Sequence, residues 1–402
     1  MINYEQFFST NAKNMKKSEI RELLKLTNKP DVISFAGGLP APDLFPVEEL
    51  RDVIDAVLTK EGRKALQYGP TEGHPGLIEE LIKFLKKEEI DITLNQLLVI
   101  TSSQQGLDLV AKVFTNPGEI IMTGRPTYVG AIQAFNSYGA RMIPIDLDEE
   151  GMDTGKLDEE ISKLMESGKK PKFIYVIPDF QNPSGITLNL ERRKELIAIA
   201  EKYDLIIIED SPYRQLRFEG KPVKPLLALC PERVLALFTF SKILLPGFRL
   251  GWMAGPAELI QKMTVAKQAV DLCAPPFNQA ILAEYMRRGL LDKQIPRIIA
   301  AYKDKRDFML EKLEKYMPKL DGLKWTRPAG GLFLWVTLPK YMNTSEMFQE
   351  AAVDNKVAYV MGSSFDPTGQ EKNTMRLNFS FATKEQIDEG IKRLGKLVAA
   401  KA

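Results

Sequence analysis

The residues that could do chemistry in this chain stand directly after short apolar runs. They are Ser103 and Gln104 after residues 97–100, Asn182 after 173–177, Asp210 and Tyr213 after 205–208, and Thr239, Ser241, Lys242 and then Arg249 after 234–238. Taken singly, each has an ordinary explanation as a helix cap, a turn residue or a solvated strand end. If the runs are parallel strands, however, these side chains meet at one edge of the sheet, where ligands of such sheets bind.

This set of side chains suits an anion and a reactive amine. A helix start at Ser103 offers free N–H groups and a favourable dipole to a phosphate, and Ser241 and Arg249 add further donors. The only lysine in the set is Lys242. A free lysine has a pKa near 10.4, about three units too high for a base at neutral pH, and burial beside Arg249 would lower it. The residues alone therefore predict a phosphate-and-amine site.

The pattern around these residues predicts an α/β fold. Between residues 97 and 260, short apolar runs alternate with helical stretches, which is typical of a mostly parallel sheet covered on both faces. The strands expected there are 97–100, 119–122, 173–177, 205–210, 234–240 and 250–254, with helices at 102–114 and 190–203. Earlier elements are a helix at 13–27, a strand at 32–35 and a helix at 46–64.

From about residue 290 the pattern changes to that of an α+β unit. A charged helix at 297–316 is followed by a strand at 330–336, a helix at 345–355, strands at 357–361 and 374–380, and a last helix from 384. A chain of 402 residues is too long for one ordinary domain. We expect an N-terminal arm and helix (1–45) that joins the small domain, a large domain (46–289) and a small C-terminal domain (290–402).

Composition argues against several classes of protein. Lys plus Arg (55) nearly balances Asp plus Glu (53), so there is no electrostatic footprint for nucleic acid or an anionic membrane. Two cysteines and one histidine make a zinc or other metal site unexpected. That histidine, His74, lies in a turn-like stretch and is expected to be solvated rather than catalytic. With no apolar run long enough for a signal peptide or a membrane span, the expected location is the cytoplasm.

Residues 239–251 (TFSKILLPGFRLG) resemble the cofactor-lysine signature of fold type I pyridoxal-phosphate-dependent aminotransferases. The same family is matched over nearly the whole chain by a wider series. That series comprises Tyr68, Ser103-Gln104, Tyr128, Asn182-Pro183-Ser184-Gly185, Asp210-x-x-Tyr213, Lys242, Arg249 and Arg376. Within the family, residues 34–42 and 68–73 resemble the branch of α-aminoadipate and kynurenine aminotransferases.

The resemblance implies a mostly parallel seven-stranded sheet in the large domain, a smaller α+β domain, and pyridoxal 5'-phosphate as the cofactor. It implies that Lys242 holds the cofactor and that Asp210 keeps its ring nitrogen protonated. Asn182 and Tyr213 would bind the phenolic oxygen, and Tyr128 would stack on the ring. The remaining cofactor-binding residues expected are Ser103, Gln104, Thr239, Ser241, Arg249 and, from the neighbouring subunit of a homodimer with shared sites, Tyr68.

For the substrate, the resemblance implies that Arg376 binds the α-carboxylate, with Gly38, Asn182 and Tyr68 nearby. Arg21 lies in a segment that resembles the mobile N-terminal helix of the α-aminoadipate branch. We expect it to bind the distal carboxylate of acidic substrates. The expected reaction moves an amino group from an α-amino acid (2-aminoadipate, glutamate, aromatic or branched-chain) to a 2-oxo acid such as 2-oxoglutarate, by a ping-pong mechanism through a pyridoxamine form.

Two alternatives use the same fold. A lyase or decarboxylase would keep the cofactor residues, because fold does not determine reaction. An effector-binding transcription regulator would need a DNA-binding helical domain ahead of the fold. The Gly-Gly-Leu-Pro segment that begins at Gly37 was expected to leave no room for one. A nicotinamide enzyme is disfavoured because no G-x-G-x-x-G follows any predicted strand.

Overall fold

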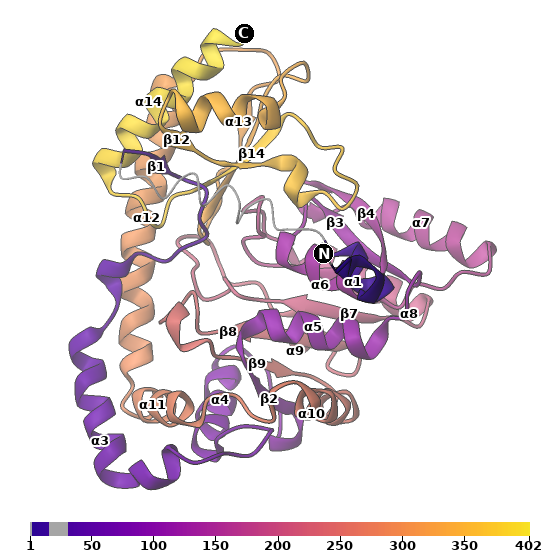
Figure 1. Cartoon of the computed structure of the whole chain (residues 1–402), viewed down its shortest axis with the longest axis vertical. Coiled ribbons are helices and arrows are strands. Elements are labelled where there is room, and N and C mark those ends of the chain that lie inside the picture. The colour runs from indigo at the N-terminus through magenta and orange to yellow at the C-terminus, as the bar shows by residue number, and fades with distance from the viewer. Residues whose placement is uncertain (1, 16–30) are drawn as a thin grey trace.

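The computed structural model describes residues 2–15 and 31–402. Most of the helix predicted at 13–27, and Arg21 with it, lies outside the described residues. Before that gap there are a 3₁₀ turn (Tyr4–Phe7) and the short helix α1 (Thr10–Asn14). Helix α1 packs against α6 (Val129–Ser137), so the beginning of the chain lies against the large sheet's helices (Figure 1).

The large sheet is mixed but mostly parallel, as predicted. Its strands follow the order β2-β9-β8-β7-β6-β3-β4-β5, in which only β9 and β5 run antiparallel to their neighbours. The bounds are β2 (Leu97–Ile100), β3 (Ile120–Arg125), β4 (Arg141–Asp148), β5 (Gly151–Met152), β6 (Phe173–Val176), β7 (Ile206–Asp210), β8 (Val234–Thr239) and β9 (Gly251–Ala254). Strands β6 and β8 inside the sheet and β2 at its edge are fully buried, and nearly all of their residues are apolar, which explains their continuous hydrophobic runs.

The prediction of seven strands was wrong by one for the part of the chain that the structure describes. The eighth, β5, is a two-residue strand that folds back on β4 through a turn ending at Gly151, whose φ is +112°. Strand β4 itself was not predicted. It contains Pro144, and most of its side chains are only half-buried. Proline is unusual inside a sheet, so the sequence pattern there argued against a strand.

Helices cover both faces of the large sheet. On β7, Glu209 contacts the backbone at α9 (Leu226–Leu229), whereas the next residue, Asp210, lines the cavity near α5 (Ser102–Phe114). Successive strand residues point to opposite faces, so α9 and α5 lie on opposite sides. Helix α6 packs with α5, and α8 (Leu190–Lys202) packs with α9 and with α7 (Thr154–Glu166).

The small sheet has the antiparallel order β10-β11-β14-β13. Its strands are β10 (Lys324–Trp325), β11 (Phe333–Thr337), β13 (Val360–Met361) and β14 (Thr374–Asn378). The strand predicted at 357–361 is divided, because β12 (Val357–Ala358) pairs instead with β1 (Ile33–Ser34) in a separate parallel ladder. Helices α13 (Thr344–Val353) and α14 (Lys384–Ala400) belong to the same half of the chain, drawn in yellow and orange in Figure 1.

The long helix α12 (Leu290–Tyr316) runs along both parts of the molecule (Figure 1). Its predicted start at residue 297 was wrong, because the helix continues through Pro296. Burial of one face, including Ile298, Tyr302 and Leu313, outweighs the missing backbone hydrogen bond. Below it, α11 (Pro276–Arg287) packs against α3 (Val47–Ala65) and α4 (Pro75–Lys87), while α10 (Ala257–Asp271) packs against α5. The domain limits at 45/46 and 289/290 stay a prediction.

None of the helices within residues 2–15 and 31–402 is long and apolar enough to cross a membrane.

Candidate active site

The predicted chemical residues line one cavity of about 650 Å³ at the carboxyl ends of the large sheet's parallel strands. The sequence-predicted residues among its lining are Gly38, Ser103, Gln104, Tyr128, Asn182, Asp210, Tyr213, Thr239, Ser241, Lys242, Arg249 and Arg376. They come from segments more than 300 residues apart in sequence, and Arg376 is the one contributed by the small sheet. One volume therefore holds an amine, a carboxylate and two guanidinium groups.

One end of the cavity is built to take an anion. Helix α5 begins at Ser102, whose φ of +61° turns the chain sharply out of β2. The Nη2 of Arg249 donates to Ser102 Oγ over 2.5 Å, and Arg249 itself has a left-handed φ of +51°. Nearby, Thr239 donates through Oγ1 to Ser241 Oγ over 3.0 Å. A helix N-terminus, two hydroxyls and a guanidinium thus gather around one point.

Lys242 is half-buried in the wall of the cavity. Its Nζ donates to the carbonyl oxygen of Gly38 over 2.8 Å. Burial, followed by the charges of Arg376 and Arg249, lowers the pKa of Lys242 to about 8. The predicted lowering by burial and by Arg249 is confirmed, and Arg376 contributes as well. Lysine at this pKa supplies a useful fraction of neutral amine at physiological pH.

The carboxylate of Asp210 is buried and half-satisfied. Its Oδ2 accepts a hydrogen bond from the hydroxyl of Tyr175 over 2.8 Å. Its Oδ1 has no hydrogen-bond partner among the residues that the structure describes. Burial raises the pKa of Asp210 to about 7, the Tyr175 hydrogen bond opposes that rise, and the charge of Glu209 adds to it. A buried carboxylate oxygen without a donor is costly unless a ligand supplies one.

The far wall holds a second cation. Arg376 is buried on β14 and donates through Nη1 to Asn182 Oδ1 (2.9 Å) and through Nη2 to the Ala36 carbonyl (2.6 Å). Its Nε has no partner among the described residues, and burial lowers its pKa to about 10. The Nδ2 of Asn182 in turn donates to the Tyr213 hydroxyl over 3.2 Å. Arg376 is therefore aimed at the cavity with no acidic side chain of the described chain to neutralise it.

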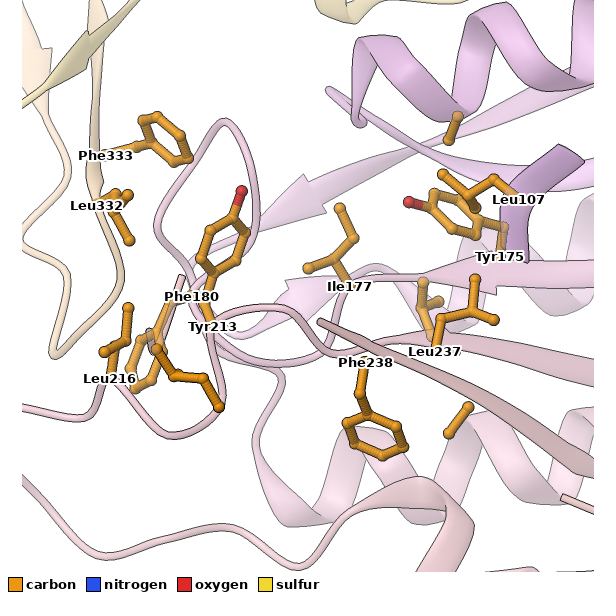
Figure 2. Close-up of a cluster of buried hydrophobic side chains, with 14 of the residues drawn as sticks. Leu107, Tyr175, Ile177, Phe180, Tyr213, Leu216, Leu237, Phe238, Leu332 and Phe333 are labelled. Carbon is orange, nitrogen blue, oxygen red and sulfur yellow. The ribbon is translucent and has the colours of Figure 1, made fainter. Parts of the chain in front are cut away.

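Aromatic rings form the walls between these groups. Tyr128 stands at the N-terminus of α6, and a Cβ on the adjoining Gly130 would lie 2.5 Å from the ring of Tyr128. On the opposite side, Phe333 lies 4.2 Å from the Arg376 guanidinium carbon and edge-on to Tyr213 (Figure 2). Sequence reasoning missed Phe333, although the Gly330-Gly331 pair before its strand marked a close approach of backbones. It also missed Tyr175.

A segment near the N-terminus links the cavity to the small sheet. The carbonyl of Phe35 accepts from the Asn378 N–H, that of Ala36 from Arg376, that of Gly38 from Lys242, and that of Leu39 from the Ser380 hydroxyl. Residues 35–39, which we call the linking segment, therefore touch the amine of the large sheet and the guanidinium of the small sheet together.

Tyr68 and His74 lie outside the cavity of their own chain. Tyr68 is 80% exposed. His74 precedes α4 and is partly buried beside Glu61, at 3.9 Å, and burial lowers its pKa. The expectation that His74 is solvated was therefore wrong, although it lines no part of the cavity. Arg21 lies beyond the residues whose positions are described.

The groups present fit pyridoxal phosphate. The unpartnered Oδ1 of Asp210 matches a protonated ring nitrogen. The amine of Lys242 matches an aldehyde, and the helix start with Arg249 matches a phosphate. Arg376, with its unpartnered Nε, remains for a carboxylate that the cofactor does not carry. Donors and acceptors thus match the cofactor and one carboxylate of a substrate.

Comparison with known proteins identifies the class. Residues 30–394 match the family model for aminotransferase class I and II, and the chain belongs to this family. With the fold and the site described above, it is a pyridoxal-phosphate-dependent aminotransferase of fold type I.

Its similarity to characterised proteins extends over the full chain. It is 50% identical over 400 residues to aromatic-amino-acid aminotransferase 1 of Thermococcus litoralis, covering 99% of this chain and 95% of that one. Its structure superimposes on kynurenine aminotransferase of Pyrococcus horikoshii with a TM-score of 0.95, 47% identity and coverage of 99% and 98%. It also resembles the α-aminoadipate aminotransferase LysN of Thermus thermophilus, solved with N-(5'-phosphopyridoxyl)-L-leucine, with a TM-score of 0.91, 35% identity and 99% of each chain covered.

Proposed function

We propose that this enzyme transfers amino groups from several kinds of α-amino acid, namely 2-aminoadipate, glutamate, aromatic and branched-chain, to a 2-oxo acid such as 2-oxoglutarate. The observation that carries the proposal is the single cavity in which the Lys242 amine and the Arg376 guanidinium both lie without an acidic partner from the described chain. Substrates with different side chains still share an α-carboxylate, which Arg376 would bind, and a reacting Cα, which Lys242 would serve.

Besides Lys242, the chain's own residues would hold the cofactor at three points. The start of α5, Ser241 and Arg249 would bind the phosphate. Asp210 would pair with the ring nitrogen, and Asn182 and Tyr213 would donate to the phenolic oxygen. When bound, pyridoxal phosphate supplies an aldehyde that links to an amine and a ring that withdraws electrons from the neighbouring carbon.

Lys242 would move the proton. Its Nζ lies in the cavity wall, and with a pKa of about 8 it can take the proton from the substrate Cα and pass it on instead of putting it back. Arg376 would orient the substrate by pairing with the α-carboxylate, replacing the water that a buried guanidinium otherwise requires. Phe333 and Tyr128 would exclude water from the reacting atoms.

Breadth of substrate is supported by the rest of the lining. Leu39, Val129 and Ile177 offer apolar surface, while Gln133 offers an amide. A distal carboxylate would need another cation, and we propose Arg21 for this role. The substitution Arg21→Ala should weaken glutamate about tenfold or more, as expected for loss of a charged hydrogen bond, and should leave leucine unchanged. An equal loss with both substrates would contradict the assignment.

We also propose a cytoplasmic homodimer with shared active sites. Tyr68 is exposed, and so are the neighbouring Leu66 and, near the N-terminus, Tyr4 and Phe7. Exposed apolar and aromatic side chains of this kind are common at interfaces between subunits. Sedimentation should show a dimer. A cofactor titration should show weaker binding in Tyr68→Phe. A monomer that is active at nanomolar concentration would refute this arrangement.

The decisive experiment separates the two half-reactions. The purified holoenzyme should be mixed with one amino acid at a time, and the change in cofactor absorbance should match the 2-oxo acid released, mole for mole. Adding 2-oxoglutarate should then restore the starting spectrum and yield glutamate. Release of carbon dioxide or ammonia in the first half-reaction would instead identify a decarboxylase or a lyase.

A further inference from the structure

Tyr175 is a buried tyrosine that no cofactor or substrate role explains. It lies on β6, with no exposed surface, and its ring packs edge-on against Phe135 at 5.3 Å between ring centres. Figure 2 shows it beside Leu107, with the hydroxyl turned toward the side of the cluster where Ile177 lies. A tyrosine in such a place needs a partner for its hydroxyl, and the identity of that partner is informative.

That partner is the cofactor-facing carboxylate. In the parallel ladder, Tyr175 stands opposite Ile208 of β7, and Asp210 is two residues further on and therefore on the same face. The long side chain of Tyr175 covers the distance of two residues along β7, so its hydroxyl donates to Asp210 Oδ2 at 2.8 Å. Because Oδ2 is occupied and Asp210 lines the cavity, Oδ1 is the oxygen left for a ligand.

We propose that Tyr175 is a positioning residue for the reaction. By holding one oxygen of Asp210, it sets the plane of the carboxylate, presents the other oxygen to the cavity and favours the ionised form. This inference rests on the proposed role of Asp210, but the geometry of the pair does not depend on that role.

The electrostatic surroundings show why the carboxylate needs this support. Burial and the adjacent Glu209 both raise the pKa of Asp210, and the Tyr175 hydroxyl is the group that lowers it. Tyr213, from the loop after β7, also interacts electrostatically with Asp210, and Lys242, Arg249 and Arg376 lie on the other walls of the cavity. Without the hydroxyl, Asp210 would be largely protonated at neutral pH and could not pair with a protonated ring nitrogen.

An ordinary buried tyrosine elsewhere in the fold supplies a matched control. Tyr359 is also fully buried, and its hydroxyl donates to the Thr344 carbonyl over 2.7 Å. Removing either hydroxyl costs one buried hydrogen bond, so Tyr175→Phe and Tyr359→Phe should lose similar stability. Only Tyr175→Phe should change the titration of Asp210.

The test begins with the apoprotein, so that it does not depend on turnover. Carboxyl ¹³C NMR of aspartate-labelled protein, with Asp210→Asn to assign the signal, should show the Asp210 titration moved upward by about one pH unit in Tyr175→Phe and unchanged in Tyr359→Phe. In the holoenzyme, the acidic limb of the kcat profile should move to higher pH by a similar amount, because Asp210 must be ionised. An unmoved Asp210 titration in Tyr175→Phe would overturn the proposal.

A second variant covers the case in which Tyr175→Phe does not fold. Site-specific replacement of Tyr175 by 3,5-difluorotyrosine keeps the shape and makes the hydroxyl a stronger donor, so the Asp210 titration should move downward. If the Asp210 titration does not move downward in this variant, the proposed role of Tyr175 is also contradicted. If instead Asp210→Asn keeps normal turnover, the proposed function of Asp210 fails, while the apoprotein titration still decides whether Tyr175 controls its charge.

Discussion

Glu209 and Asp210 are neighbours on β7, and each belongs to a different buried cluster of charged groups. Both are at most 2% exposed, and burial raises the pKa of both carboxyls. On one face of the sheet, Glu209 accepts from the Ser211 hydroxyl through Oε1 and from the Leu227 N–H through Oε2. On the other face, Asp210 has a partner for only one of its two oxygens within the described chain.

The cluster around Glu209 is closed by protein partners. Asp179, with no exposed surface, accepts from Arg193 at 2.8 Å and from Arg214 at 3.1 Å, and Arg217 lies 3.5 Å away. Arg193 also donates to three backbone carbonyls. Asp179 is three residues before Asn182, and Arg214 is one residue after Tyr213, so this closed cluster braces the two loops that carry cavity residues.

Because the two carboxyls are equally buried, the difference between them lies in how many of their oxygens have hydrogen-bond partners. A scaffold satisfies its buried polar groups internally, since an unpaired one costs free energy. A site leaves selected groups unpaired because the ligand completes them. The closed cluster around Asp179 should therefore govern stability, and the cavity residues Asp210 and Lys242 should govern activity. The substitutions below test this division between stability and activity.

The largest effect is expected for Lys242→Ala. Loss of the amine that holds the cofactor and moves the proton should lower turnover by on the order of 10⁴-fold or more. The melting temperature of the apoprotein should be unchanged or higher, because a desolvated amine is removed. The matched control is Lys267→Ala, which removes a buried lysine that is paired with Asp271 at 2.5 Å and lines no part of the cavity. A lower melting temperature for Lys242→Ala than for Lys267→Ala would argue against the division.

The next largest effect should come from Asp179→Asn in the closed cluster. Removing the charge leaves Arg193 buried without a carboxylate partner, which should reduce the free energy of unfolding by about 3–5 kcal/mol. Urea unfolding of the apoprotein measures this. Turnover per folded molecule should fall much less than in Lys242→Ala. If stability is unaffected, the cluster does not brace the fold.

A smaller effect is expected when the adjacent carboxylates are neutralised one at a time. Asp210→Asn should cut kcat/KM by about 10²-fold, as expected for loss of one electrostatic contact in a site, with little change in melting temperature. Glu209→Gln should do the reverse, lowering stability by about 1–3 kcal/mol with nearly normal kinetics. Equal effects on kinetics from the two substitutions would erase the distinction between the two faces.

The smallest effect is a dependence of apoprotein stability on pH. The pKa of Lys242 is about 8 in the folded protein and near 10.4 when unfolded. Because the folded pKa is the lower one, the unfolded chain binds more protons between these values, and stability should rise with pH across that interval. The gain should total on the order of 3 kcal/mol. It should be absent in Lys242→Met, so the difference between the two proteins in denaturant unfolding from pH 7.5 to 10 isolates it.

Sequence reasoning succeeded where local pattern and chemistry agree. The continuous apolar runs of β6, β7 and β8 identified the interior strands of the sheet and that of β2 identified its edge, and the polar residues after them led to the cavity. The same reasoning failed where tertiary packing overrides local preference. The strand β4, which contains Pro144, was not predicted, and the helix α12, which contains Pro296, was predicted to begin seven residues too late.

The site was predictable in type but not in its supporting contacts. Lys242, Asp210 and Arg249 follow from their place after strands, which the sequence displays. Tyr175 reads as one more apolar strand residue, and its contact with Asp210 depends on the register between β6 and β7, which no local pattern specifies. The closed cluster around Asp179 escaped notice for the same reason, since its arginines come from helix α8 and from the loop after β7.

The linking segment has a consequence for how the two sheets communicate. Its carbonyls bind the Lys242 amine at one residue and side chains or backbone of the small sheet at the residues on either side. Whenever Lys242 turns from Gly38 toward another partner, the segment loses its only anchor to that amine while its anchors to the small sheet remain. The hydrogen bonding of one nitrogen atom is thus tied to the stretch of backbone that joins the two sheets.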